Sequence, residues 1–149
     1  MLTHKDLMVG DWVYLINTTH NVSFPENGVI QDEGYTTIRI PIKITTVSEN
    51  CVSYYSNKLE SYVTLSFEEI EPIPVTPEIL EKNGFETHPS NLRMFFEHDD
   101  YRLCYYLNSS NHFTSFNNIN GSLVQKVIVN IHEIQHALKF CEIDKDIVL

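Results

Sequence analysis

The chain has 149 residues, of which 42% are hydrophobic and 20% are charged. This composition is typical of a globular protein, and the length fits one domain or two small lobes. The formal net charge of −10 disfavours binding to nucleic-acid phosphates. Residues 1–10 contain no apolar signal segment, and no apolar run approaches the roughly 20 residues that span a bilayer. We therefore expect a cytoplasmic protein with no membrane partner.

Three cysteines, Cys51, Cys104 and Cys141, are widely spaced along the chain. Their odd number and the lack of a C-x-x-C pair argue against a disulfide framework and against a thiolate metal site. We expect all three to be reduced and buried.

Alternating apolar and polar residues predict strands in the N-terminal half. The first strand follows the turn at Gly10, and residues 17–34 form a long loop or an irregular hairpin because they are polar and contain turn residues. Further strands are predicted at residues 35–47, 51–56 and 61–67. In the strand at 35–47, one face is apolar through Ile38, Ile40, Ile42 and Ile44.

Pro41 lies within that strand and has no N–H for a ladder, so the strand is an edge, is bulged, or is interrupted there. Short strands at this spacing predict a small SH3-like β-barrel over residues 8–74. The two prolines of residues 71–75 then make a stiff connector. A short helix should begin after Thr76 as its N-cap, with Pro77 in the first helical position, and should end at Gly84.

Three strands of an antiparallel sheet are predicted next, at residues 92–97, 101–107 and 112–116. A C-terminal helix should begin at Ser122, because Gln125 lies three residues on in a capping-box pattern, and should continue to Cys141. Its apolar face is predicted to pack across the second sheet. The residues of this face are Val124, Val127, Ile128, Ile131, Ile134 and Leu138.

Residues 132–136 read His-Glu-Ile-Gln-His, an H-E-x-x-H pattern within the predicted helix. In a zinc hydrolase of this kind, His132 and His136 would be metal ligands and Glu133 would be the general base for the metal-bound water. A third protein ligand is also required. Glu142 lies at the ligand spacing, but an unbroken helix would carry it past the metal. His98, Asp99 or His112 would have to be brought to the site by the fold.

The competing interpretation makes these residues structural. On a helical wheel, His132 and His136 flank the apolar face, so His132 packs at the boundary of the sheet while Glu133 and His136 face solvent. Val129, His136 and Phe140 form a second small stripe that suggests contact with another surface. Aromatic residues of the barrel either form a ligand groove or belong to the core. These are Trp12, Tyr14, Tyr54, Tyr55 and Tyr62.

Three stretches, at residues 9–13, 71–85 and 131–138, together resemble a family of small uncharacterised proteins of gut bacterial genomes, often associated with prophage or other mobile elements. The resemblance implies a setting and no activity. The family pattern at the last stretch is similar to His-Gln-Leu-Gln followed by His or Asn, so Glu133 departs from it. Glutamine at the place of the general base argues against zinc hydrolysis as the function of such a family.

We therefore predict an α+β protein with an SH3-like barrel lobe at residues 1–75, followed at 76–149 by a short helix, an antiparallel sheet and a C-terminal helix. The predicted function is a non-enzymatic interaction module that binds a protein partner and needs no cofactor. The alternative is a zinc-dependent hydrolase that uses His132, Glu133 and His136.

Overall fold

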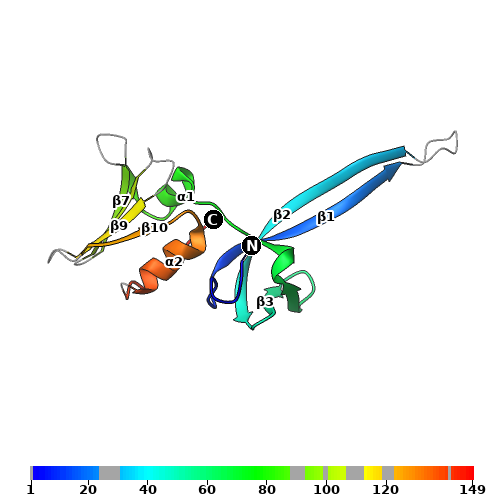
Figure 1. Ribbon diagram of the computed structural model, residues 1–149, viewed down its shortest axis with the longest axis horizontal. Helices are drawn as coiled ribbons and strands as arrows, with labels where there is room; N and C mark the ends of the chain where they lie inside the picture. Colours follow the sequence, from blue (N-terminus) through cyan, green and yellow to red (C-terminus); the bar gives the residue numbers. More distant parts are fainter. Residues whose placement is uncertain are drawn as a thin grey trace. The chain divides into compact units, whose positions relative to one another are not determined.

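The computed structural model describes residues 2–23, 31–87, 93–98, 101–106, 113–118, 123–140 and 142–149. Within these ranges, only the backbone is described at residues 22–23, 31–33, 93, 97–98 and 101–127. The chain divides into two compact units, residues 1–72 and 73–149, which we call unit 1 and unit 2 (Figure 1). Both units are rich in antiparallel strands, and unit 2 ends with a helix.

Unit 1 contains a five-stranded antiparallel sheet with the order β4-β3-β2-β1-β5. The strands are β1 (Trp12–Ser23), β2 (Gln31–Val47), β3 (Cys51–Ser56), β4 (Ser61–Ser66) and β5 (Ile70–Pro72), and a 3-10 helix, η1 (Phe67–Glu69), precedes β5. The predicted strands at 51–56 and 61–67 are confirmed. Among the described residues no ladder joins β4 to β5, so the sheet is open and no closed barrel is observed.

Strands β1 and β2 form a long hairpin whose register runs from Trp12 opposite Lys43 to Ser23 opposite Gln31. β5 pairs only with the base of β1 at Val13–Leu15. We call residues 16–23 and 31–39 the arm, and Figure 1 shows it extending away from the rest of unit 1. Within the stretch 17–34, predicted as a loop or an irregular hairpin, residues 17–23 and 31–34 are strand, and the hairpin alternative is confirmed by their pairing and by the irregularity between Asn21 and Val22.

The isoleucines of β2 share one face, as predicted, but only part of that face is buried. Ile42 and Ile44 are buried in the core, whereas Ile38 and Ile40 are 53% and 43% exposed. The outer part of this face is exposed because β2 continues beyond the strands that cover its base. Pro41 pairs with Tyr14 and precedes Ile44, where the pairing of β2 with β3 begins. The edge interpretation of Pro41 is confirmed.

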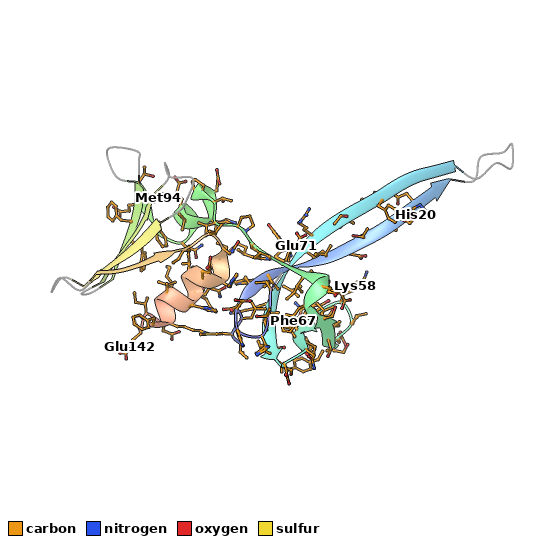
Figure 2. All side chains as sticks on the ribbon, viewed as in Figure 1. His20, Lys58, Phe67, Glu71, Met94 and Glu142 are labelled. Atoms are coloured by element: carbon orange, nitrogen blue, oxygen red, sulfur yellow. The ribbon has the colours of Figure 1, made fainter. Side chains whose placement is uncertain are left out.

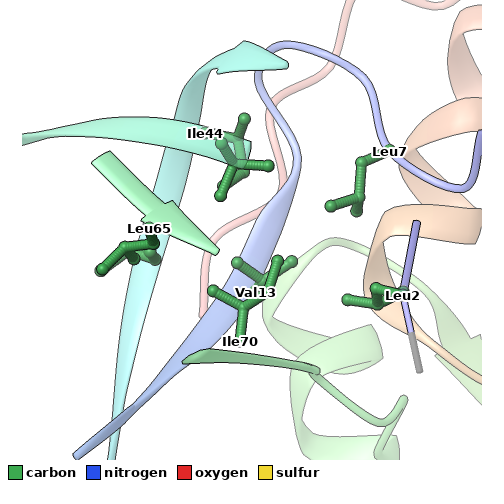
Figure 3. Packing of buried hydrophobic residues seen from close by; sticks show 8 residues of the cluster. Leu2, Leu7, Val13, Ile44, Leu65 and Ile70 are labelled. Atoms are coloured by element: carbon green, nitrogen blue, oxygen red, sulfur yellow. The ribbon is translucent and has the colours of Figure 1, made fainter. Parts of the chain in front are cut away.

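Figure 3 shows the core of unit 1, where side chains from the N-terminal segment pack against the base of the sheet. Leu2 and Leu7 precede the first strand and cover Val13, which is fully buried. The remaining members come from β2 to β5. The buried cluster is Leu2, Leu7, Val13, Ile42, Ile44, Val52, Leu65 and Ile70.

Unit 2 begins with the predicted connector, and this connector pairs with a distant segment. The Val75 N–H donates to the Val129 carbonyl (2.9 Å) and the Ile131 N–H donates to the Ile73 carbonyl (2.8 Å). Helix α1 (Pro77–Lys82) then begins at Thr76, whose hydroxyl accepts a hydrogen bond from the Ile79 N–H. The chain leaves the helix through Gly84 at φ +78°, a conformation that glycine adopts without strain. The predicted short helix is confirmed.

The sheet of unit 2 has the order β10-β9-β8-β7-β6 and is antiparallel throughout. Its strands are β6 (Glu86–Thr87), β7 (Arg93–His98), β8 (Tyr101–Tyr106), β9 (Phe113–Asn118) and β10 (Leu123–Val127). The three predicted strands correspond to β7, β8 and β9. The predicted helix start at Ser122, a residue outside the described ranges, was wrong, because the segment directly after it is β10.

The C-terminal helix, α2 (Ile131–Phe140), begins later than predicted. Ile131, Ile134 and Leu138 are buried, as expected for the apolar face, and so is Ile128 just before the helix. Val124 and Val127 belong instead to β10. β-Branched residues dominate 123–129 and favour strand over helix.

The last residues of the chain return to α1. Asn83, which is 3% exposed, donates from Nδ2 to the carbonyls of Ile79 (2.7 Å) and Val148 (2.8 Å), and its Oδ1 accepts from the Val148 N–H (2.9 Å). Ile143 and Ile147 are buried in the same segment. One buried amide therefore fixes both the end of α1 and the C-terminal segment.

Candidate functional site

The two histidines of the H-E-x-x-H pattern lie side by side in the first turns of α2. Their ring centroids are 5.8 Å apart, with the rings edge to face at 70°. His132 is 4% exposed and His136 is half-buried. The spacing along the helix thus brings the two imidazoles together, as the sequence predicted.

The Glu133 side chain caps the N-terminus of the same helix. Its Oε2 accepts hydrogen bonds from the backbone N–H groups of Val129 (2.8 Å) and Asn130 (3.0 Å), and from the Asn130 amide (3.5 Å). This is the glutamate half of a capping box, in which a residue in the first turn reaches back to N–H groups that have no partner within the helix. The backbone contacts give Glu133 a structural role that the sequence interpretation did not include.

A catalytic zinc site needs a third protein ligand beside the two histidines. Among the side chains that the structure describes, no group of three histidines, cysteines or carboxylates is placed to hold a metal ion. The side chains of His98, Asp99 and His112, the candidate third ligands, lie outside the described set. The zinc hydrolase alternative therefore stays a prediction.

Glu142, labelled in Figure 2, follows the end of α2. Its φ of +57° turns the chain, and the Ile143 N–H then donates to the Leu138 carbonyl (2.9 Å). The prediction of a helix as far as Cys141 concerns a residue outside the described ranges, and at Glu142 the chain has already left the helical path. The turn leads Ile143 into the core, and Glu142 itself is exposed.

Replacing Glu133 tests its role in the helix. Glu133→Ala should lower the free energy of unfolding by about 1 kcal/mol, the usual value of a lost cap. Glu133→Gln should cost less, because its amide oxygen still accepts a hydrogen bond. Urea denaturation of both variants measures the difference. A larger loss in the glutamine variant would contradict the capping role.

Metal analysis of tag-free protein tests the zinc alternative independently. Stoichiometric zinc that is lost in a His132→Ala variant would establish the metal site, and zinc-free protein would end this interpretation.

A second candidate site is an open groove in unit 1, with a volume of about 850 Å³. It lies along residues 40–45 of β2, beside the end of β3 and the turn that follows it, and we call it the β2 groove. Trp12, Tyr54 and Tyr55 line it, as predicted for an aromatic groove, whereas Tyr14 and Tyr62 do not. Its remaining lining residues are Val9, Gly10, Leu15, Ile40, Pro41, Ile42, Lys43, Ile44, Thr45, Ser56, Asn57 and Lys58.

The charge of the β2 groove is opposite to that of the whole chain. Its lining residues include Lys43 and Lys58 and no carboxylate, whereas the chain has a net charge of −10. Lys58, labelled in Figure 2, lies in the exposed turn between β3 and β4. Sequence reasoning missed both lysines, because they are 15 residues apart and only the hairpin register places them at one groove.

Comparison with protein-family models, curated proteins and solved structures gave no match. The assignment of a function therefore rests on the geometry of the sites. In the described part of the chain, no helix has the length and hydrophobicity needed to cross a bilayer.

The stripe predicted on the other side of α2 has two exposed members. Val129 is 42% exposed and Phe140 is 77% exposed, with the half-buried His136 between them in sequence. The β2 groove is the stronger candidate for binding, because it combines three aromatic residues with two lysines in one lining.

Proposed function

We propose that the protein is a non-enzymatic interaction module whose β2 groove binds an extended, acidic segment of a partner protein. The observation that carries this proposal is the combination of aromatic and apolar lining with two lysines and no carboxylate. In an acidic chain, such a groove attracts a carboxylate-bearing partner that the remaining surface repels.

The groove follows residues 40–45 of one strand, and this linear lining favours an extended partner segment. Tyr54 and Tyr55 are neighbours on β3, and Tyr55 is 46% exposed. Its ring contacts the ring of Tyr62 edge to face, with centroids 5.3 Å apart. This contact limits the movement of the Tyr55 ring, and a positioned aromatic side chain loses little conformational entropy on binding. Apolar side chains of the partner would pack here, while its carboxylates would lie at Lys43 and Lys58.

We further propose that unit 1 is an SH3-like barrel in its topology. Two features support this: β1 pairs with both β2 and β5, which brings the first and last strands together, and η1 leads directly into β5. A cytoplasmic setting and an origin in a mobile element are proposed from the cysteine pattern and from the family resemblance of residues 71–85. Cys51 is a free thiol, which agrees with such a setting, and it is half-buried where a buried thiol was expected.

Selection from a displayed library of random peptides tests the groove. We expect the wild-type protein to enrich peptides in which aspartate or glutamate lies beside apolar residues. Lys58→Glu should weaken binding of those peptides at least about tenfold, because it places like charges together. Fluorescence anisotropy with one enriched peptide gives the affinities.

Lys5→Glu is the matched control, since it makes the same charge change at an exposed residue of unit 1 that does not line the groove. It should leave peptide affinity within about twofold of the wild type, because Lys5 does not line the groove and salt screens exposed charges. Equal weakening by both variants would show a general charge effect and would contradict the proposal. Failure of the wild type to enrich acidic peptides would also contradict it.

A further inference from the structure

The outer edge of β1 in the arm has a composition unlike that of a protected edge strand. Over Trp12–Ser23 the sequence contains no lysine, arginine, aspartate, glutamate or proline. Natural sheets commonly use these residues at exposed edges to prevent pairing with another chain. β5 covers this edge only at Val13–Leu15, and among the described strands none pairs with the edge beyond Leu15.

The other edge of the same hairpin is protected. β2 contains Asp32, Glu33, Arg39, Pro41 and Lys43 within the part that precedes its pairing with β3. Arg39 does not contribute to this protection, because its Nε reaches across β1 to Oε2 of Glu71 in β5 (2.7 Å). The two edges of the arm therefore differ: charges and a proline protect β2, whereas β1 has neither.

The arm is also exposed on both faces. The described side chains at residues 17–20 and 35–39 are all exposed. Across the strands, the hydroxyls of Thr18 and Thr37 are 3.1 Å apart, and the rings of His20 and Tyr35 stack with centroids 4.6 Å apart. A two-stranded ribbon of this kind is at best marginally stable in water, and additional strands stabilise it.

We propose that the outer edge of β1, residues 16–23, pairs antiparallel with the same edge of a second copy of the chain. The two arms would then form one four-stranded sheet with the order β2-β1-β1-β2. A second copy fits because a two-fold axis makes one edge complementary to itself. Two copies of an acidic chain repel each other wherever carboxylates meet, so an edge without charged residues favours a second copy. A basic partner strand would instead be attracted by an acidic edge. This inference is independent of the β2 groove, whose lining on β1 consists of Trp12 and Leu15 and includes none of residues 16–23.

The register identifies a backbone group that such pairing needs. Pro41 has no N–H and lies opposite Tyr14, so these two residues form a non-hydrogen-bonded pair. The N–H and C=O groups of Tyr14 therefore point away from β2, toward the outer edge of β1. Because this direction alternates along a strand, Ile16 and Thr18 also direct their N–H groups outward. The register is continuous over this stretch, since its only irregularity lies between Asn21 and Val22. The Thr18 N–H would donate to the second copy.

Thr18→Pro removes that donor, and Thr37→Pro is its matched control. Thr37 lies directly opposite Thr18, so it points outward at the β2 edge, and both variants lose the same contact between hydroxyls. Proline is compatible with outward positions of edge strands, as Pro41 illustrates. Sedimentation equilibrium of the full-length chain should give twice the 17.3 kDa chain mass for the wild type and for Thr37→Pro. Thr18→Pro should raise the dimer dissociation constant about thirtyfold, because the symmetric contact loses two hydrogen bonds.

A monomeric wild type would overturn the proposal, and so would equal dissociation constants for the two proline variants. Should either proline variant fail to fold by circular dichroism, Thr18→Lys and Thr37→Lys replace them, since lysine keeps the N–H and adds charge to one edge at a time. Weaker dimerisation of Thr18→Lys than of Thr37→Lys is then the expected result, and no difference would overturn the proposal.

Discussion

Ile134→Ala should lower the free energy of unfolding of unit 2 by about 2–5 kcal/mol, the usual cost of removing a buried isoleucine side chain. Ile134 is 1% exposed at the centre of the buried face of α2. The truncation removes apolar contacts and leaves a cavity that close-packed neighbours fill only in part. Urea denaturation followed by far-ultraviolet circular dichroism measures the change.

Phe140→Ala is the control on the same helix. It removes a larger apolar side chain, but Phe140 is 77% exposed, so we expect a change within about 0.5 kcal/mol. A loss at Phe140 that equals the loss at Ile134 would show that Phe140 is covered in solution, and it would contradict the packing described for α2.

Asn83→Ala should have the second-largest effect, about 2–3 kcal/mol. The buried amide makes three hydrogen bonds that join the end of α1 to Val148, and alanine would leave the Val148 N–H without its acceptor. The C-terminal segment should then open more often than the rest of unit 2. Faster hydrogen exchange at residues 142–149, measured together with urea denaturation, tests both effects.

Lys82→Ala provides the comparison, because Lys82 also contacts the C-terminal segment through a hydrogen bond from Nζ to the Leu149 carbonyl (2.8 Å). This contact is exposed to solvent, so its loss should change stability by no more than about 0.5 kcal/mol. If Lys82→Ala accelerated exchange as much as Asn83→Ala, burial of the amide would not be the cause.

The elements predicted correctly from sequence are those whose signals are local. Thr76 and Pro77 define the start of α1, and Gly84 defines its end, because capping, φ restriction and positive φ depend on few neighbours. The strands at residues 51–56 and 61–66 follow their alternation directly.

The error at the C-terminal helix shows where local signals compete. Ser122 and Gln125 match a capping box, but Asn130 and Glu133 match one as well, and Glu133 holds the N–H groups of Val129 and Asn130. The apolar residues after Ser122 fit either a helix or a strand. Pairing of β10 with β9 decides between them, and such a long-range contact has no local signature.

In the candidate sites, too, features set by local spacing were predicted and features set by long-range pairing were not. Local spacing was enough to place the imidazoles of His132 and His136 together. The β2 groove was anticipated only through its aromatic residues, because Lys43 and Lys58 join it through the register of separate strands. The exposure of Ile38 and Ile40 was missed for a related reason: their alternation predicts one apolar face but not how far the neighbouring strands extend.

The pairing of Ile73–Val75 with residues 129–131 determines where the chain can be divided into independent fragments. A fragment beginning at residue 76, the predicted boundary, would lose the Ile73 carbonyl that accepts from the Ile131 N–H, and the Val75 N–H that donates to Val129. It would also lose the Ile73 side chain, which is 1% exposed. A fragment that begins at Ile73 keeps both backbone hydrogen bonds. Residues 73–75 are therefore part of the folded C-terminal unit and do not act as a linker.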